Sequence, residues 1–214
     1  MEPVSVSQLL AALFEAHGVE FVVHEGWVAP GGRLPAIRAT WYPRGKTGRL
    51  DVDVLLEDDN RHFQEAFAGV GEGEAGLRDA WENFCRNSFH VLLSALWGRV
   101  DEDQVTVETW QVGEQRFEAH LGNFCTRGAD GKVPALPEDL FPSIEAQIRA
   151  LPLDGRIHWF RHFFCAFDNQ RTVEALFDNE PWQAGMDSFA GLAWQDSEAY
   201  YSARNFLVIK PVPA

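Results

Sequence analysis

A run rich in aromatic residues spans positions 156–167. Read with a period of two, it places Trp159 and Phe163 on one face and Phe160 and Phe164 on the other. Aromatic residues favour strands, and apolar side chains on both faces are typical of a strand covered on both sides. Turn-forming Asp-Gly and Asp-Asn pairs bound the run. The pattern therefore predicts an interior strand of a sheet.

Elsewhere, apolar residues recur at every second position in some segments, which is typical of strands, and at every third or fourth position in others, which is typical of helices. The predicted elements, in order, are a helix over 5–17, strands over 20–29, 36–42 and 50–56, a strand or helical turn over 63–70, a long helix over 77–97, a hairpin of 104–112 and 115–125, a helix over 137–150, strands over 156–167 and 172–177, a short helix over 181–192, and a closing strand over 200–210. This order indicates an α+β fold with mostly antiparallel, twisted sheets packed by helices, including one long central helix.

Short sequence signals mark the ends of the two longest N-terminal helices. Ser5 or Ser7 is expected to cap the first helix, and Gly18 to end it. Gly98 is expected to end the long helix. A loop rich in Gly and Pro over 126–137 is the best linker, so we expect a first part over 1–126 and a second part over 137–214, packed together as one compact unit.

The composition indicates the cellular location and the classes of partner to expect. The chain has 214 residues, a formal net charge of −14 and three cysteines, and no apolar segment of membrane-spanning length. A strongly acidic protein is repelled by phosphate backbones and by anionic lipid, so we expect neither a nucleic-acid partner nor a membrane partner. With an odd cysteine count and no recognisable signal peptide, the expected location is the reducing cytoplasm.

The negative charge is concentrated in residues 51–82, which we call the acidic segment. It holds ten acidic and two basic residues, so its net charge is −8. Asp51 and Asp53 alternate with apolar residues and are expected on a wet sheet face, and Asp58 and Asp59 follow that strand. A local field of one sign steers partners of the opposite sign. These four carboxylates are therefore candidate binding residues for a basic protein, and Trp182 is a candidate exposed anchor.

The sequence gives little support for a metal site or for a catalytic cysteine. His158 and His162 share a face of the predicted strand but lie about 13 Å apart at ~3.3 Å per residue, too far for one zinc ion. The three cysteines follow Phe and have apolar neighbours, which favours buried structural thiols, and Cys125 lies on the opposite strand face from His120. We expect no metal and no other cofactor, and the sequence assigns no catalytic residue.

The closing run 200–209, with Trp182-Gln183-Ala184-Gly185 before it, resembles a family of bacterial proteins of unknown function. That resemblance implies no activity. The element order of the first part is also similar to that of small acidic secretion chaperones, a likeness of order and charge alone. The leading hypothesis is a non-enzymatic protein-binding protein with an acidic face, like an immunity protein or a chaperone. The alternative is a small-molecule enzyme with a His/carboxylate cleft near the central strand, using His158 or His162.

Overall fold

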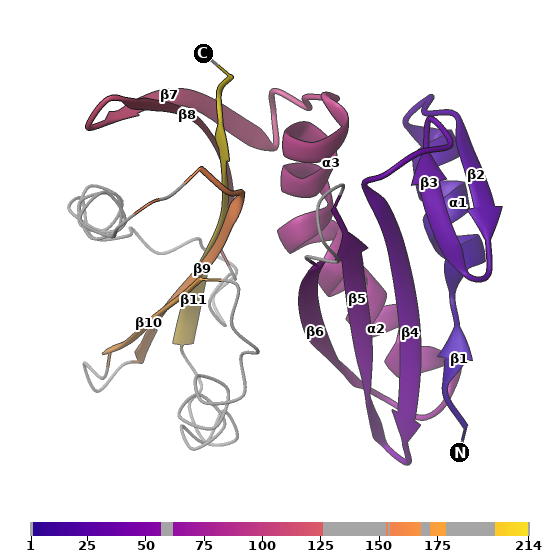
Figure 1. Cartoon of the computed structure of the whole chain (residues 1–214). Coiled ribbons are helices and arrows are strands. Elements are labelled where there is room, and N and C mark those ends of the chain that lie inside the picture. Colours follow the sequence, from indigo (N-terminus) through magenta and orange to yellow (C-terminus); the bar gives the residue numbers. More distant parts are fainter. Residues whose placement is uncertain are drawn as a thin grey trace. The chain divides into compact units, whose positions relative to one another are not determined.

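The computed structural model describes residues 2–56, 62–125, 153, 155–167, 172–178 and 200–213, and divides into two compact units, Met1–Arg86 and Asn87–Ala214. We call them unit 1 and unit 2 and describe each by itself (Figure 1). All strand pairs are antiparallel among the described residues. The predicted α+β fold with antiparallel sheets and helices is confirmed.

Unit 1 holds one six-stranded sheet. Its order is β2-β3-β4-β5-β6, and β1 pairs with β4 beside this path. The strands are β1 Val4–Ser5, β2 Phe21–His24, β3 Trp27–Pro30, β4 Ala36–Arg44, β5 Thr47–Leu55 and β6 His62–Val70. The segment over 63–70, predicted as either strand or helical turn, is thus a full strand. The strand predicted over 20–29 is wrong in detail, because Glu25 and Gly26 adopt φ of 49° and 82° and turn the chain into a hairpin.

Two helices cover one face of this sheet. Helix α1, Ser7–Ala16, buries Leu10 and Phe14, and α2, Glu74–Phe84, packs on β4, β5 and β6. Buried apolar residues alternate along β4 and β5 beneath the helices: Ile37, Ala39, Trp41, Leu50, Val52 and Val54. The hydrophobic core of unit 1 therefore lies between the helices and this face.

The predicted cap of α1 is wrong, whereas the predicted stop is confirmed. Val6 occupies the N-cap position without a side-chain hydrogen bond, and the Ser5 hydroxyl donates to that of Ser7 at 3.4 Å instead. Gly18 follows α1 with φ of 65°, and its N–H donates to the carbonyl of Glu15.

The long central helix is confirmed as three consecutive segments. α2 passes into a π-helical turn over Cys85–Phe89 and then into α3, His90–Trp97. Gly98 ends α3 in the left-handed conformation, with φ of 66°. The boundary between the two units, after Arg86, falls within the π-helical turn.

Unit 2 holds a five-stranded sheet of order β10-β9-β11-β8-β7. The strands are β7 Val105–Val112, β8 Gln115–Cys125, β9 His158–Phe167, β10 Thr172–Asp178 and β11 Tyr200–Pro211. Both β9 and β11 have a hydrogen-bonded neighbour on each side, so the two predicted interior strands are confirmed. The β7–β8 hairpin pairs with β11, which places it with the C-terminal half of the chain.

Because of that pairing, the boundary between the two units differs from the one that the sequence predicts. The sequence places a boundary at 126–137, whereas the structure divides after Arg86, because β8 is hydrogen-bonded to β11, and their paired residues lie 78 to 94 positions apart in the chain, from Cys125 with Ala203 to Phe117 with Pro211. The linker over 126–137 and the helices predicted over 137–150 and 181–192 lie outside the described residues. Among the described helices, none combines the length and apolar character needed to cross a membrane.

Candidate functional site

The candidate site of unit 2 arises where α3 lies along strand β8. A Cβ on Gly122 would overlap the side chain of Val91, so only glycine fits beneath the first turn of the helix. One turn further along α3, Ser94 meets His120. Alternation along β8 puts Gly122, His120 and Glu118 on the same face, and the helical period presents Val91 to Gly122 and Ser94 to His120. This packing covers part of a strand face that carries polar side chains.

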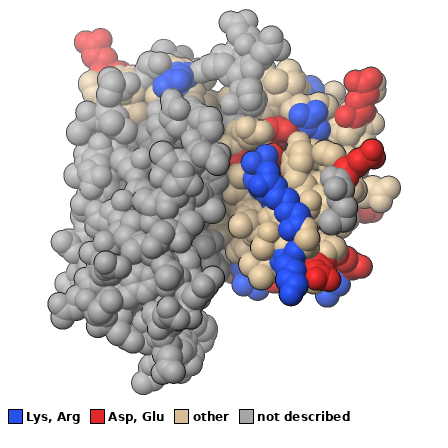
Figure 2. Space-filling model, turned by 90° about the horizontal axis from the view of Figure 1, so that it is seen from below, with Lys and Arg blue, Asp and Glu red and all other residues tan. Residues whose placement is uncertain are grey.

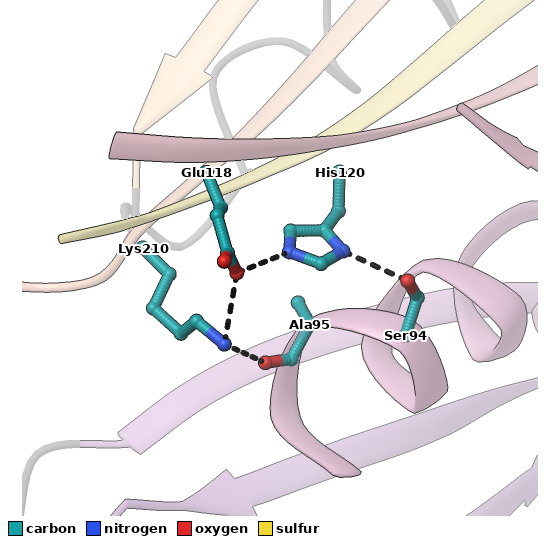
Figure 3. A network of polar contacts seen from close by, with 5 residues as sticks. All are labelled: Ser94, Ala95, Glu118, His120 and Lys210. Atoms are coloured by element: carbon teal, nitrogen blue, oxygen red, sulfur yellow. Dashed lines mark hydrogen bonds and ion pairs between the residues drawn. The ribbon is translucent and has the colours of Figure 1, made fainter. Parts of the chain in front are cut away.

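Four side chains form a continuous polar network on this face (Figure 3). The Ser94 Oγ and His120 Nδ1 atoms lie 2.8 Å apart, and His120 Nε2 lies 3.4 Å from Glu118 Oε2. Lys210 on β11 stands opposite Glu118 in the register, and its Nζ lies 3.2 Å from the same Oε2. Lys210 also donates to the carbonyl oxygen of Ala95, at 3.3 Å.

Burial and neighbouring charges determine the protonation states of Glu118 and His120. Burial opposes ionisation of Glu118, but the hydrogen bond and charge of Lys210, together with the hydrogen bond of His120, outweigh it and lower the pKa of Glu118. Burial lowers the pKa of His120, so its ring is neutral at pH 7. An ionised carboxylate only accepts hydrogen bonds, so His120 carries its proton on Nε2 and Nδ1 accepts from the Ser94 hydroxyl.

An open pocket of about 460 Å³ borders this network. We call it the α3–β8 pocket and define it by its nine lining residues: Ser94, Gly98, Val100, Glu102, Val105, Val107, Glu118, His120 and Lys210. Its volume lies in the range of small-molecule sites in proteins. Val100 and Val107 on its wall remain 51% and 42% exposed, although both are large apolar residues. The pocket thus combines an apolar wall with an oriented polar network.

The chemistry of the network favours binding over nucleophilic attack. A serine, a histidine and a carboxylate in hydrogen-bonded sequence resemble the relay that activates a serine nucleophile. Here Ser94 is only 1% exposed. The nearby end of α3 presents carbonyl oxygens, whose partial negative charge would repel a developing oxyanion. Both features oppose a nucleophilic role for Ser94.

The structure places Asp51 and Asp53 differently from the sequence prediction. They lie on the sheet face away from the helices, as alternation requires, but are only 5% and 8% exposed, so the predicted wet setting is wrong. Arg49 binds Asp51 through two contacts, Nε to Oδ1 at 2.7 Å and Nη2 to Oδ2 at 2.8 Å. Burial raises the pKa of Asp51, although the hydrogen bond and charge of Arg49 act against this.

Asp53 has a comparable setting. It accepts hydrogen bonds from Arg38 and Gln64, each at 3.1 Å, which stand beside it in the register. The guanidinium of Arg38 also lies over the Trp27 ring, 4.5 Å from the ring centre. The arginines that neutralise the two aspartates are side chains of the same sheet, so these carboxylates are part of the structure of unit 1.

The remaining predicted site residues, Asp58, Asp59 and Trp182, lie outside the described residues. Of the ten carboxylates in the acidic segment, Asp51, Asp53 and Glu65 are each buried, and four are exposed: Glu72, Glu74, Asp79 and Glu82. The side of the molecule in Figure 2 shows Lys and Arg in a strip across the described surface, with Asp and Glu beside it. On that side the described surface carries charges of both signs.

The other predicted chemistry residues are separated. Cys85 is half-buried, and burial, followed by the charge of Glu82, raises the pKa of its thiol to about 12. His158 is buried on β9, and the side chains of His162, Cys125 and Cys165 lie outside the description. Within the described part of the chain, no three His, Cys, Asp or Glu side chains are grouped so as to hold a metal ion.

Sequence reasoning considered His120 only as a partner for Cys125, and it missed Ser94, Glu118 and Lys210. One signal was present: Ser94 is the polar residue in the apolar run Val91–Trp97. A buried hydroxyl needs a hydrogen-bond partner, so this position predicted a polar group facing it. The identity of that partner depends on the packing of α3 on β8.

Comparison with known proteins adds a family but no activity. A protein-family model matches residues 22–211, which is most of the chain, and its description is of a family of unknown function. No curated protein matches the chain. No solved structure matches it either.

Proposed function

The chain belongs to DUF6348, a family of unknown function, so its role has to be inferred from its own residues, and we propose that unit 2 binds a small organic molecule in the α3–β8 pocket. The observation that carries this proposal is the pairing of a pocket of about 460 Å³ with a connected polar network on its wall, in which Ser94 and His120 are buried and Glu118 and Lys210 are half-buried. Protein sites for small molecules combine a mainly apolar lining with a few fixed polar groups.

The fixed groups come from three different elements. Ser94 lies on α3, Glu118 and His120 on β8, and Lys210 on β11. Glu118 holds the His120 ring in one tautomer and orientation, and Lys210 holds Glu118. A ligand would therefore meet polar groups that are already oriented, which reduces the entropy lost on binding. The proposal keeps the small-molecule class of the alternative hypothesis but assigns it to different residues.

We expect Val107→Trp to abolish small-molecule binding, because an indole would fill the space beside this exposed wall position. Ligand-observed NMR of a fragment library against the wild-type protein identifies binders, and each binder is then measured with the variant. Thr109→Trp is the matched control, since Thr109 is exposed on the same face of β7 and does not line the pocket. Fragments that bind both variants as well as the wild type would contradict the proposal.

We propose protein docking by the acidic segment as a second candidate function. The exposed positions of Glu72, Glu74, Asp79 and Glu82 support it. Ion pairs of Arg78 with Glu74 and of Arg86 with Glu82 reduce the available charge, and the two pairs are 3.1 and 3.4 Å long. The docking surface would therefore be smaller and less negative than the sequence suggests.

Under the docking hypothesis, Glu72→Lys/Glu82→Lys should slow association with a basic partner about tenfold at low salt, because attraction between opposite charges accelerates encounter. The difference should vanish at high salt, where screening is strong. The measurement is the association rate with a basic protein obtained by affinity capture. Glu15→Lys/Glu20→Lys changes the net charge equally at exposed positions outside the segment and serves as the control. Equal rates for both double variants would remove the hypothesis.

A further inference from the structure

We infer that the ligand of the α3–β8 pocket is a small organic cation: an ammonium or amidinium group attached to an apolar body. This inference rests on the proposed function and specifies its ligand. It follows from the hydrogen-bonding capacity that the network leaves open, from the charge of the pocket and from the apolar wall.

The open capacity consists mainly of acceptors. Both ring nitrogens of His120 are engaged, by Ser94 and by Glu118. Lys210 directs its ammonium to Glu118 and to the carbonyl of Ala95. In contrast, Glu118 Oε1 and both carboxylate oxygens of Glu102 receive no hydrogen bond from any described residue. A ligand that supplies hydrogen-bond donors would satisfy these atoms.

The charge of the pocket has the same sign as its open acceptors. Glu102 and Glu118 contribute two negative charges, Lys210 contributes one positive charge and His120 is neutral, which leaves one negative charge. The C-terminal end of α3 adds the partial negative charge of its carbonyl groups. A monovalent cation would neutralise the pocket, whereas an anion would add to its excess charge.

Lys210 itself shows how an ammonium group is held at this place. Its Nζ lies 3.2 Å from Glu118 Oε2 and 3.3 Å from the Ala95 carbonyl oxygen, which are a carboxylate and a helix end (Figure 3). The second oxygen of Glu118 and the carboxylate of Glu102 offer acceptors of the same chemical kind to a ligand. Cations are favoured at helix C-termini.

The apolar wall requires a second part of the ligand. Val100 and Val107 line the pocket with exposed apolar side chains, and the buried Val105 lines it as well. Removing apolar area from water is favourable in proportion to the area covered, so an apolar body gains affinity that a bare ammonium ion would not. The volume of about 460 Å³ admits a ring with a short substituent.

Three probes that share a phenyl ring and a similar size but differ in charge test this inference: benzylammonium, benzyl alcohol and benzoate. Binding is followed in the ¹⁵N-labelled full chain by the amide signals of Val107 and Lys210. We expect benzylammonium to bind at least about tenfold more tightly than benzoate, because the charge term changes sign between them. Glu102→Gln should weaken benzylammonium binding about three- to fivefold, the effect of one exposed ion pair, and leave benzyl alcohol unchanged.

Asp103→Asn is the matched control, because this exposed neighbour of Glu102 carries the same charge and does not line the pocket. Equal or tighter binding of benzyl alcohol or benzoate overturns the cation inference while the pocket remains a ligand site. An equal effect of Glu102→Gln and Asp103→Asn also overturns it, since the effect would then come from net charge. If none of the probes shifts the pocket signals, both the inference and the proposed function fail.

Discussion

Gly69→Ala is expected to lower the free energy of unfolding by about 3 kcal/mol, at the upper end of the cost of over-packing. Gly69 lies on β6 directly beneath α2. A Cβ at this position would overlap the backbone carbonyl oxygen of Gly76 and lie 3.0 Å from the Cβ of Ala80. Relief would require α2 to move off the sheet, since a backbone carbonyl does not rotate away like a side chain. Urea denaturation of the wild type and the variant measures the difference.

Gly155→Ala is the control for this prediction. Its Cβ would meet no atom within 4 Å, and its φ is not in the left-handed region. Its effect should stay within about 0.5 kcal/mol, as for most surface substitutions. Similar stabilities of the two variants would show that α2 does not lie against β6 at Gly69.

Asp51→Lys is expected to destabilise the chain by about 3 kcal/mol, because it replaces the buried partner of Arg49 with a second cation. The cost stays at the lower end for a broken ion pair, since the Arg49 side chain is 43% exposed and is partly rehydrated. Asp51→Asn keeps the shape and removes the charge. It should cost only about 1 kcal/mol, because the burial that raises the pKa of Asp51 also makes its charge unfavourable.

Glu72→Lys provides the comparison, with the same change of charge at an exposed position of the acidic segment. Its effect on the free energy of unfolding should be within about 0.5 kcal/mol. Thermal unfolding of the three variants ranks them. If Asp51→Lys were as stable as Glu72→Lys, Asp51 would face water, as alternation alone predicts.

Local sequence signals predicted most of the described elements. The alternation of Leu50, Val52 and Val54 is enough to identify a strand with one apolar face, and these residues are buried as predicted. Gly18 and Gly98 identified two helix ends, because a left-handed residue after a helix is most often glycine. The hairpin at Glu25 and Gly26 was missed because Glu rarely adopts a positive φ.

The candidate site was not predictable in the same way. Glu118 and His120 alternate with buried Phe117 and Ala119, a pattern typical of a strand with one wet face. That α3 covers part of this polar face depends on the glycine at position 122 and on the register of β8 with β11. Register joins residues far apart in the chain, and no local pattern encodes which strands are neighbours.

The sequence by itself determined the α+β class, the interior positions of β9 and β11 and the long helix, which was predicted over 77–97 and observed over 74–97. Each follows from apolar periodicity, which is a local property of the chain. Only the tertiary structure decided that Asp51 and Asp53 are buried against Arg49 and Arg38, and that Ser94, Glu118, His120 and Lys210 meet beside a pocket. The physical reason is that alternation assigns a side chain to a face of the sheet, whereas burial and hydrogen bonding depend on what packs against that face.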